Sequence, residues 1–188
     1  MEITTLDIDG AWLAHSPLWS DQRGFFREWF KLADIQKATG HSFSAEQANI
    51  SESSRGTVRG IHYSIAQRGQ AKWVTCVTGS IKDYVVDIRP ESKNFGKWIE
   101  IELSADSGKA VLIGEGLGHA FVSLEDKTTV AYLVSTPFSP TEEFEINPLD
   151  PAIASNWGLD FAELKISDKD RNAPTLLERK AEGKLPQY

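Results

Sequence analysis

Short runs of alternating apolar and polar residues, each bounded by turn-forming residues, follow one another along most of this chain. Residues 98–103, Trp-Ile-Glu-Ile-Glu-Leu, are the clearest example, and such runs predict β-strands. Helical spacing is confined to two short segments, residues 31–40 and 174–182, which end near Gly40 and Gly183. Many short strands with few helices predict an all-β fold, a jelly-roll barrel or sandwich with a few short peripheral helices.

Length and charge limit the classes of partner. The 188 residues suit a single domain spanning 1–188 with a substantial core. A net charge of −7 argues against nucleic acid or an anionic membrane as partner, although a local cluster of cations can still bind a small anion. The sequence contains no apolar stretch of membrane-spanning length and no pattern of a signal peptide. Cys76 is the lone cysteine, which fits a cytoplasmic location.

Charged residues accompany the two most apolar runs. Residues 72–77 and 81–89 flank a Gly79-Ser80 turn, and this pattern predicts a β-hairpin. Alternation places Lys72 on one face with Val74 and Cys76, and it places Asp83 with Ile81 and Val85. A charge directed at an apolar surface is costly unless it is paired or used, so these two residues are candidates for function.

Two histidines lie in apolar strand context beside glycines. His62 belongs to the segment 59–63, Arg-Gly-Ile-His-Tyr, and His119 to a glycine-rich run at 114–121. The glycines do not match a nucleotide-binding fingerprint, because strands are expected on both sides of them. No His-x-His pair exists, so a metal site is disfavoured on ligand count. Cys76 lies inside a predicted strand and is expected to be a packed apolar residue.

Five separated segments, together with Lys72, form a set of motifs: 59–63, 86–90, 95–98, 118–121 and 167–170. Together they resemble the dTDP-4-dehydrorhamnose 3,5-epimerase family of nucleotide-sugar epimerases. The resemblance covers most of the chain, from about Asp21 to about Leu177. It implies a cupin-like jelly-roll barrel without a metal or other cofactor, and an isomerase that inverts C3 and C5 of dTDP-4-keto-6-deoxy-D-glucose.

The resemblance also implies roles for the sugar-facing residues. His62 matches the base that removes a proton beside the C4 ketone, and Asp170 matches its carboxylate partner. Lys72 would stabilise the enolate, and Tyr132 would act as the general acid. A phenol suits this role if a neighbouring cation lowers its pKa toward the working pH. Asp83 and His119 match supporting positions in or beside the sugar pocket.

The nucleotide would be held by a second set of residues. Pattern alone favours a solvent-facing charge at Glu28, but the resemblance places it near the thymine. Arg23 and Arg59 match pyrophosphate contacts, because a guanidinium suits phosphate oxygens. Family members are homodimers in which N-terminal strands cross to the partner. The remaining matches are Phe26 at the base, and Gln47 and Asn49 as polar contacts to base and sugar.

Phe138 departs from the family pattern, because many members carry a tyrosine there. It is either a tolerated packing change or the mark of a mono-epimerase that inverts C3 only or C5 only, in an antibiotic-type deoxysugar pathway. Two functions of other classes stay open at this point. One is a metal-dependent cupin oxygenase or isomerase, and the other is a sugar-nucleotide sensor that binds without turnover.

Overall fold

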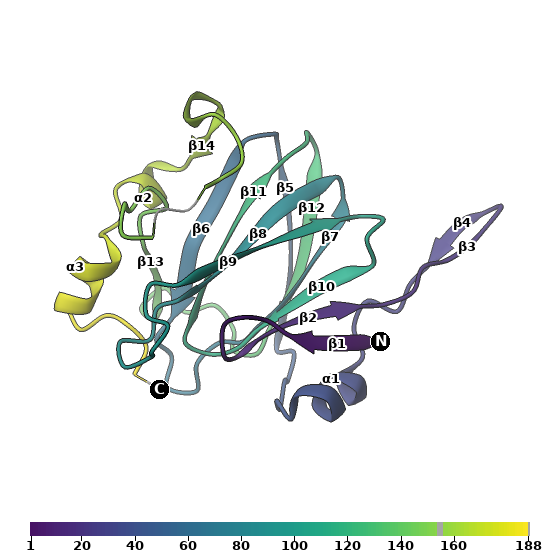
Figure 1. Ribbon diagram of the computed structural model, residues 1–188, viewed down its shortest axis with the longest axis horizontal. Helices are drawn as coiled ribbons and strands as arrows, with labels where there is room; N and C mark the ends of the chain where they lie inside the picture. Colours follow the sequence, from purple (N-terminus) through teal and green to yellow (C-terminus); the bar gives the residue numbers. More distant parts are fainter. Residues whose placement is uncertain (154–155, 188) are drawn as a thin grey trace.

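The computed structural model describes residues 1–153 and 156–187, and short β-strands dominate it (Figure 1). The first sheet has the order β1 (Glu2–Thr5), β2 (Ala11–His15), β10 (Lys109–Ile113), β7 (Lys72–Thr78), β12 (Thr128–Val134) and β5 (Gln47–Ser53). The second has the order β13 (Glu143–Glu145), β6 (Thr57–Ser64), β11 (Leu117–Ser123), β8 (Ser80–Asp87) and β9 (Trp98–Ser104). Short strand β14 (Lys165–Ile166) lies parallel to β6, and β3 (Trp19–Asp21) pairs with β4 (Gly24–Phe26) in a separate hairpin.

The helices are short and peripheral. They are α1 (Leu32–Thr39), the 3-10 turn η1 (Phe161–Glu163), α2 (Asp168–Arg171) and α3 (Leu176–Ala181). Helix α1 ends at Gly40, whose φ of 70° suits a residue without a Cβ. In the part of the chain that the structure describes, no helix is both long enough and apolar enough to cross a membrane.

Two facing sheets enclose the main core, and this arrangement confirms the predicted all-β jelly roll. Apolar side chains from both sheets fill the space between them, among them Val74 and Cys76 of β7 and Ile81 and Val85 of β8. A second apolar cluster lies behind the second sheet, under the C-terminal segment that includes α3. A third covers the outer face of the first sheet near α1.

The predicted hairpin of residues 72–77 and 81–89 is wrong. Strand β7 pairs with β10 and β12, whereas β8 pairs with β11 and β9 in the opposite sheet. The turn at Gly79 therefore carries the chain from one sheet to the other. A Cβ at Gly79 would lie 2.5 Å from the Thr128 hydroxyl, so the turn tolerates little besides glycine. The predicted faces are nevertheless correct, because the apolar residues that alternate in step with Lys72 and Asp83 pack in the core between the sheets.

Strand β6 approaches its neighbour β11 unusually closely at Gly60. A Cβ there would lie 2.5 Å from both the Ala120 Cβ and the His119 carbonyl oxygen, and the φ of Gly60 is 121°. The register of the two strands shifts between His119 and Phe121, opposite this glycine. The irregularity immediately precedes His62 and contributes to its placement.

The N-terminal segment contains two pairs of short antiparallel strands. Residues 1–15 form two strands, β1 and β2, that pair with each other at the edge of the first sheet. The second pair, β3 and β4, forms a hairpin that projects away from the barrel (Figure 1). Phe25 and Phe26 are 57 % and 65 % exposed, because no other described part of this chain covers them.

Candidate active site

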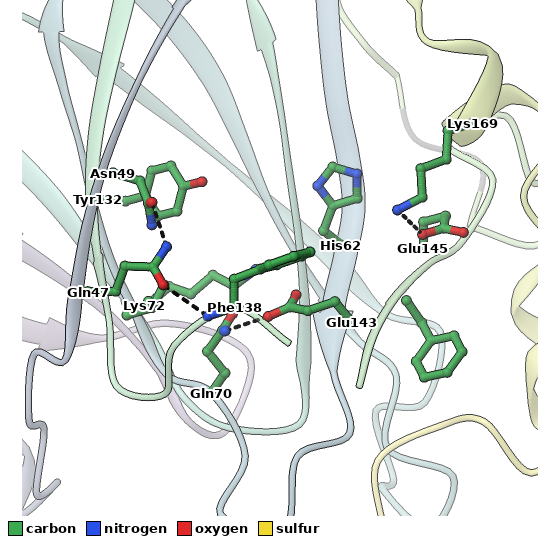
Figure 2. A pocket seen from close by; sticks show the side chains of 12 residues that line it. Gln47, Asn49, His62, Gln70, Lys72, Tyr132, Phe138, Glu143, Glu145 and Lys169 are labelled. Atoms are coloured by element: carbon green, nitrogen blue, oxygen red, sulfur yellow. Dashed lines mark hydrogen bonds and ion pairs between the residues drawn. The ribbon is translucent and has the colours of Figure 1, made fainter. Parts of the chain in front are cut away.

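A pocket of about 290 Å³ opens between the two sheets, where β5, β7 and β12 of one face β6 and β13 of the other (Figure 2). Tyr132 and Asn49 lie on one side of it, and His62 lies on the opposite side. The two walls therefore present different chemistry to anything bound between them. The lining residues are Gln47, Asn49, His62, Gln70, Lys72, Tyr132, Val134, Phe138, Glu143, Phe144, Glu145 and Lys169.

His62 is held by a carboxylate from outside the sheet. Its Nε2 lies 2.7 Å from Asp170 Oδ1, and Ser167 Oγ donates to Asp170 Oδ2 at 2.9 Å. Burial alone would raise the pKa of Asp170. The hydrogen bond and charge of His62, together with Ser167 and Lys169, outweigh burial and leave this pKa below its usual value. An ionised carboxylate therefore fixes the imidazole, the arrangement that makes a histidine an effective base.

Lys72 lies on the pocket wall opposite His62. This wall consists of rows of directly paired residues from β5, β12 and β7. Val134 of β12 pairs with Gln47 on one side and Lys72 on the other, and Tyr132 pairs with Asn49 in the next row. Because directly paired residues of neighbouring strands share a face, all these side chains face the pocket side of the first sheet. The predicted set Lys72, Tyr132, Gln47 and Asn49 is thus brought together by three adjacent strands.

The ammonium group of Lys72 is an unusual buried cation. The residue is 7 % exposed, and within residues 1–153 and 156–187 it forms no ion pair. Burial lowers its pKa, while the negative charges of Glu143 and Asp83 act in the opposite direction. A desolvated cation at the wall of a pocket is suited to stabilising negative charge that develops on a bound molecule.

Tyr132 differs from expectation in its acidity. Burial and the charge of Glu143 raise the pKa of its phenol, and the opposing effect of Arg59 is smaller. The expected lowering by a neighbouring cation is therefore wrong in its net direction. A raised pKa keeps the hydroxyl protonated at neutral pH, so Tyr132 is able to donate a proton.

His119 and Asp83 form a second imidazole–carboxylate pair, deeper in the barrel. Their Nε2 and Oδ2 atoms are 2.7 Å apart, and both side chains are almost fully buried. His119 pairs directly with His62 across β11 and β6. Asp83 Oδ1 has no hydrogen-bond partner in the described part of the chain. Neither residue lines the pocket, so both support its wall from behind.

Phe138 lies at the mouth of the pocket, where its ring extends toward His62 (Figure 2). Its backbone N–H donates to Gln47 Oε1 at 2.9 Å, and Gln47 Nε2 in turn donates to Asn49 Oδ1 at 2.8 Å. This chain of contacts orders two polar side chains around an aromatic ring that is 61 % exposed. A flat, exposed ring beside amide groups is a suitable surface for stacking a base or a sugar.

Arg59 faces an adjoining cleft rather than the pocket itself. Its guanidinium donates to Ser53 Oγ at 3.1 Å and to the Glu52 carbonyl at 3.2 Å. The cleft shares His62 with the pocket and holds two further cations, Lys165 and Lys169. An anion next to the pocket would therefore meet positive charge at this opening.

Arg23, Phe26 and Glu28 line neither the pocket nor its adjoining cleft. Arg23 and Phe26 lie on the projecting β3–β4 hairpin, where Arg23 pairs with Asp21 and its side chain is 89 % exposed. Glu28 lies in a separate groove beside Lys31.

The structure adds pocket residues that the sequence did not indicate. Gln70 and Glu143 come from a loop and a three-residue strand, and neither has a local signal in the sequence. Lys169 forms an ion pair with Glu145 at 2.8 Å, and it belongs to the motif 167–170 without having been singled out. Within the described ranges, no group of three or more His, Cys, Asp or Glu side chains is arranged to hold a metal ion.

Comparison with known proteins gives a consistent result. A model of the dTDP-4-dehydrorhamnose 3,5-epimerase family matches residues 5–178. The chain is 44 % identical over 188 residues to a dTDP-4-dehydrorhamnose 3,5-epimerase of Mycolicibacterium smegmatis, covering 100 % of this chain and 92 % of the relative.

Two solved structures share the fold along nearly their whole length. An rmlC epimerase of Mycobacterium tuberculosis superposes with a TM-score of 0.96 at 40 % identity, covering 100 % of this chain and 94 % of the other. A 3′-monoepimerase of Streptomyces bikiniensis, solved with dTDP-quinovose, has a TM-score of 0.92 at 43 % identity and covers 97 % and 92 %. Relatives that invert one carbon and relatives that invert two are thus equally similar to this chain.

Proposed function

Because the chain belongs to the dTDP-4-dehydrorhamnose 3,5-epimerase family and is an isomerase of dTDP-sugars, we propose that it inverts both C3 and C5 of dTDP-4-keto-6-deoxy-D-glucose. The observation that carries the proposal is that the two facing walls of the pocket present different acid–base groups. An imidazole base lies on one wall of the pocket, and a phenol and a buried ammonium lie on the other. Inversion needs a proton to leave one face of the carbon and another to arrive on the opposite face.

His62 removes the proton in this mechanism. The C4 ketone acidifies the hydrogens on C3 and C5, because the carbanion delocalises onto the ketone oxygen. Asp170, ionised and 2.7 Å from the imidazole, stabilises the imidazolium that forms. The Asp170 side chain is 6 % exposed and the His62 side chain is 41 % exposed, so solvent reaches this contact from the His62 side and screens it in part.

Lys72 stabilises the enolate oxygen. Its ammonium group has no ion-pair partner in the described residues, so its charge is available to the substrate. Tyr132, kept protonated by burial and by Glu143, returns a proton to the opposite face of the carbon. Nothing in these steps requires a cofactor, because the ketone of the substrate accepts the electron pair.

The nucleotide half of the site is proposed to be completed by a second copy of the chain. Arg59 and the adjoining cleft supply cations for the diphosphate. The exposed β3–β4 hairpin, with Arg23 and Phe26, would reach the partner's pocket together with Glu28 and so form a homodimer. Mixing two inactive variants, Arg23→Ala and His62→Ala, tests this exchange, because mixed dimers then contain one intact site. Activity that stays at the level of the separate variants would count against it.

A mono-epimerase is the second candidate, and Phe138 favours it. The ring lies at the pocket mouth but has no hydroxyl with which to orient the sugar or donate a proton. The similarity to a 3′-monoepimerase supports this candidate as well. If Phe138 decides the outcome, Phe138→Tyr changes which carbons are inverted, and an unchanged pattern would refute that role.

The deciding experiment is NMR of dTDP-4-keto-6-deoxy-D-glucose incubated with the protein in D2O. Deuterium at both C3 and C5 supports the double epimerase, and deuterium at one carbon supports the mono-epimerase. No exchange by folded protein would reject both and favour a sensor that binds without turnover. Stoichiometric iron, manganese or zinc in the purified protein would instead favour a metal-dependent cupin enzyme.

A further inference from the structure

The Glu143 carboxylate is fixed in the pocket wall by the side chain of Gln70, a residue that takes no part in the steps described above. Gln70 Nε2 donates to Glu143 Oε1 at 2.6 Å and also to the Thr136 carbonyl at 2.9 Å. Gln70 is 7 % exposed, and the neighbouring Thr136 hydroxyl donates to the Gly69 carbonyl at 2.6 Å. These bonds join the segment before β7, the end of β12 and the short strand β13 into one rigid corner.

This corner places the negative charge of the Glu143 carboxylate in the same pocket as Lys72 and Tyr132, the two functional groups on the wall of the first sheet. Lys72 follows Gln70 by two residues, and Lys72, Tyr132 and Glu143 all line the same pocket (Figure 2). No carboxylate in the described part of the chain forms an ion pair with Lys72. Glu143 therefore acts on the ammonium through space and leaves it free to meet the substrate.

We propose that Glu143, held by Gln70, is a positioning residue that keeps Lys72 and Tyr132 protonated during the reaction. This inference rests on the proposed function, in which Lys72 must be a cation and Tyr132 must hold a proton. The electrostatics have the required sign, because the charge of Glu143 raises the pKa of both groups. One carboxylate thus opposes the loss of protons that burial promotes at Lys72.

Among the charged groups of the described residues, Glu143 is the one that raises the pKa of both Lys72 and Tyr132. Asp83 of β8 also raises the Lys72 pKa, but it is hydrogen-bonded to His119 behind the pocket wall. Arg59 of β6 opposes Glu143 at Tyr132. The remaining titratable groups of the pocket are His62 of β6, Glu145 of β13 and Lys169 of α2, and the last two neutralise each other in an ion pair.

The test is Glu143→Gln, which removes the charge and keeps the shape of the side chain. Lys72 is titrated directly by NMR in protein labelled with ¹³C-lysine, in the absence of substrate, and its signal is assigned with Lys72→Arg. We expect its titration to move about one pH unit lower in Glu143→Gln. The alkaline limb of kcat should move in the same direction. Glu142→Gln is the matched control, with the same charge change one residue away and outside the pocket lining, and should move neither.

Two further variants allow the result to be interpreted if Glu143→Gln alone is not conclusive. Glu143→Asp retains the negative charge, so the midpoint of the Lys72 titration should stay close to that of the native protein. If Glu143→Gln does not fold, Gln70→Ala frees the carboxylate from its corner and should lower the Lys72 titration by a smaller amount. An unchanged Lys72 titration in every folded variant would overturn the inference. A shifted titration in a protein that exchanges no deuterium would leave the inference standing and reject the proposed function.

Discussion

Replacing Asp170 with asparagine isolates the contribution of its negative charge to the action of His62. The substitution keeps the size of the side chain and its position on α2, where the Ser167 side chain caps the helix. It removes the charge that lies 2.7 Å from the imidazole. We expect kcat to fall while KM stays nearly constant, because Asp170 acts through His62 and does not line the sugar pocket.

The magnitude follows from the geometry. A hydrogen bond to a charged partner contributes about 1.5–3 kcal/mol. The His62 side chain is 41 % exposed, so solvent screens part of this contribution, and the lower half of the range applies. A loss of about 1.5–2.2 kcal/mol corresponds to a fall in kcat of roughly 10- to 40-fold, since about 1.36 kcal/mol changes a rate tenfold.

The assay is the initial rate of deuterium incorporation into the substrate, measured at saturating substrate concentration. Asp168→Asn is the matched control, because it makes the same change two residues earlier at an exposed position of the same helix. Its rate should equal that of the native protein. A fall below threefold in folded Asp170→Asn would refute the claim that this carboxylate supports the base.

Three further predictions concern the fold. Asp87→Asn should lower the free energy of unfolding at neutral pH by about 3 kcal/mol in chemical denaturation, because it breaks a buried pair with Arg89. The pKa of Asp87 is depressed in the folded state, so its contribution is complete above the unfolded pKa of about 4 and is lost as pH falls further. The acid-induced loss of stability should therefore be shallower in the variant. Gly60→Ala should lower the melting temperature measured by calorimetry, because the new methyl group collides with Ala120, and an unchanged value would contradict the close approach of β6 to β11. Burial raises the pKa of Cys76 to about 11, so a thiol reagent at about pH 8 should label it only after unfolding, and rapid labelling of native protein would argue against its burial.

The strand content of the chain was predictable, but the partners of the strands were not. Alternation identified β9 almost residue by residue and assigned the inward faces of β7 and β8 correctly. A tight glycine turn between two apolar runs predicts a hairpin, yet the same turn serves equally well to cross between sheets. The choice depends on which strands compete for each edge, and that information lies far away along the chain.

The candidate site was predictable where motifs are local. His62, Lys72 and Tyr132 line the pocket as expected, and Asp170 supports it through 108 residues of separation in sequence. The Gln70–Glu143 contact could not be predicted, because its partners lie 73 residues apart in irregular or very short segments. The direction of the Tyr132 pKa shift was predicted wrongly because a sequence does not reveal how deeply a phenol is buried, and burial is the largest cause of the raised pKa.

Insertions and deletions should be tolerated very unevenly within residues 72–87. Lys72 and Asp83 belong to consecutive strands of opposite sheets, and each is aimed inward by the parity of its position in its strand. One residue inserted between Lys72 and Val74 would turn either the cation or the core side chains outward. The turn at Gly79 cannot absorb the extra residue, because Thr128 packs directly against this glycine. These strands should therefore accept substitutions more readily than any change in their length.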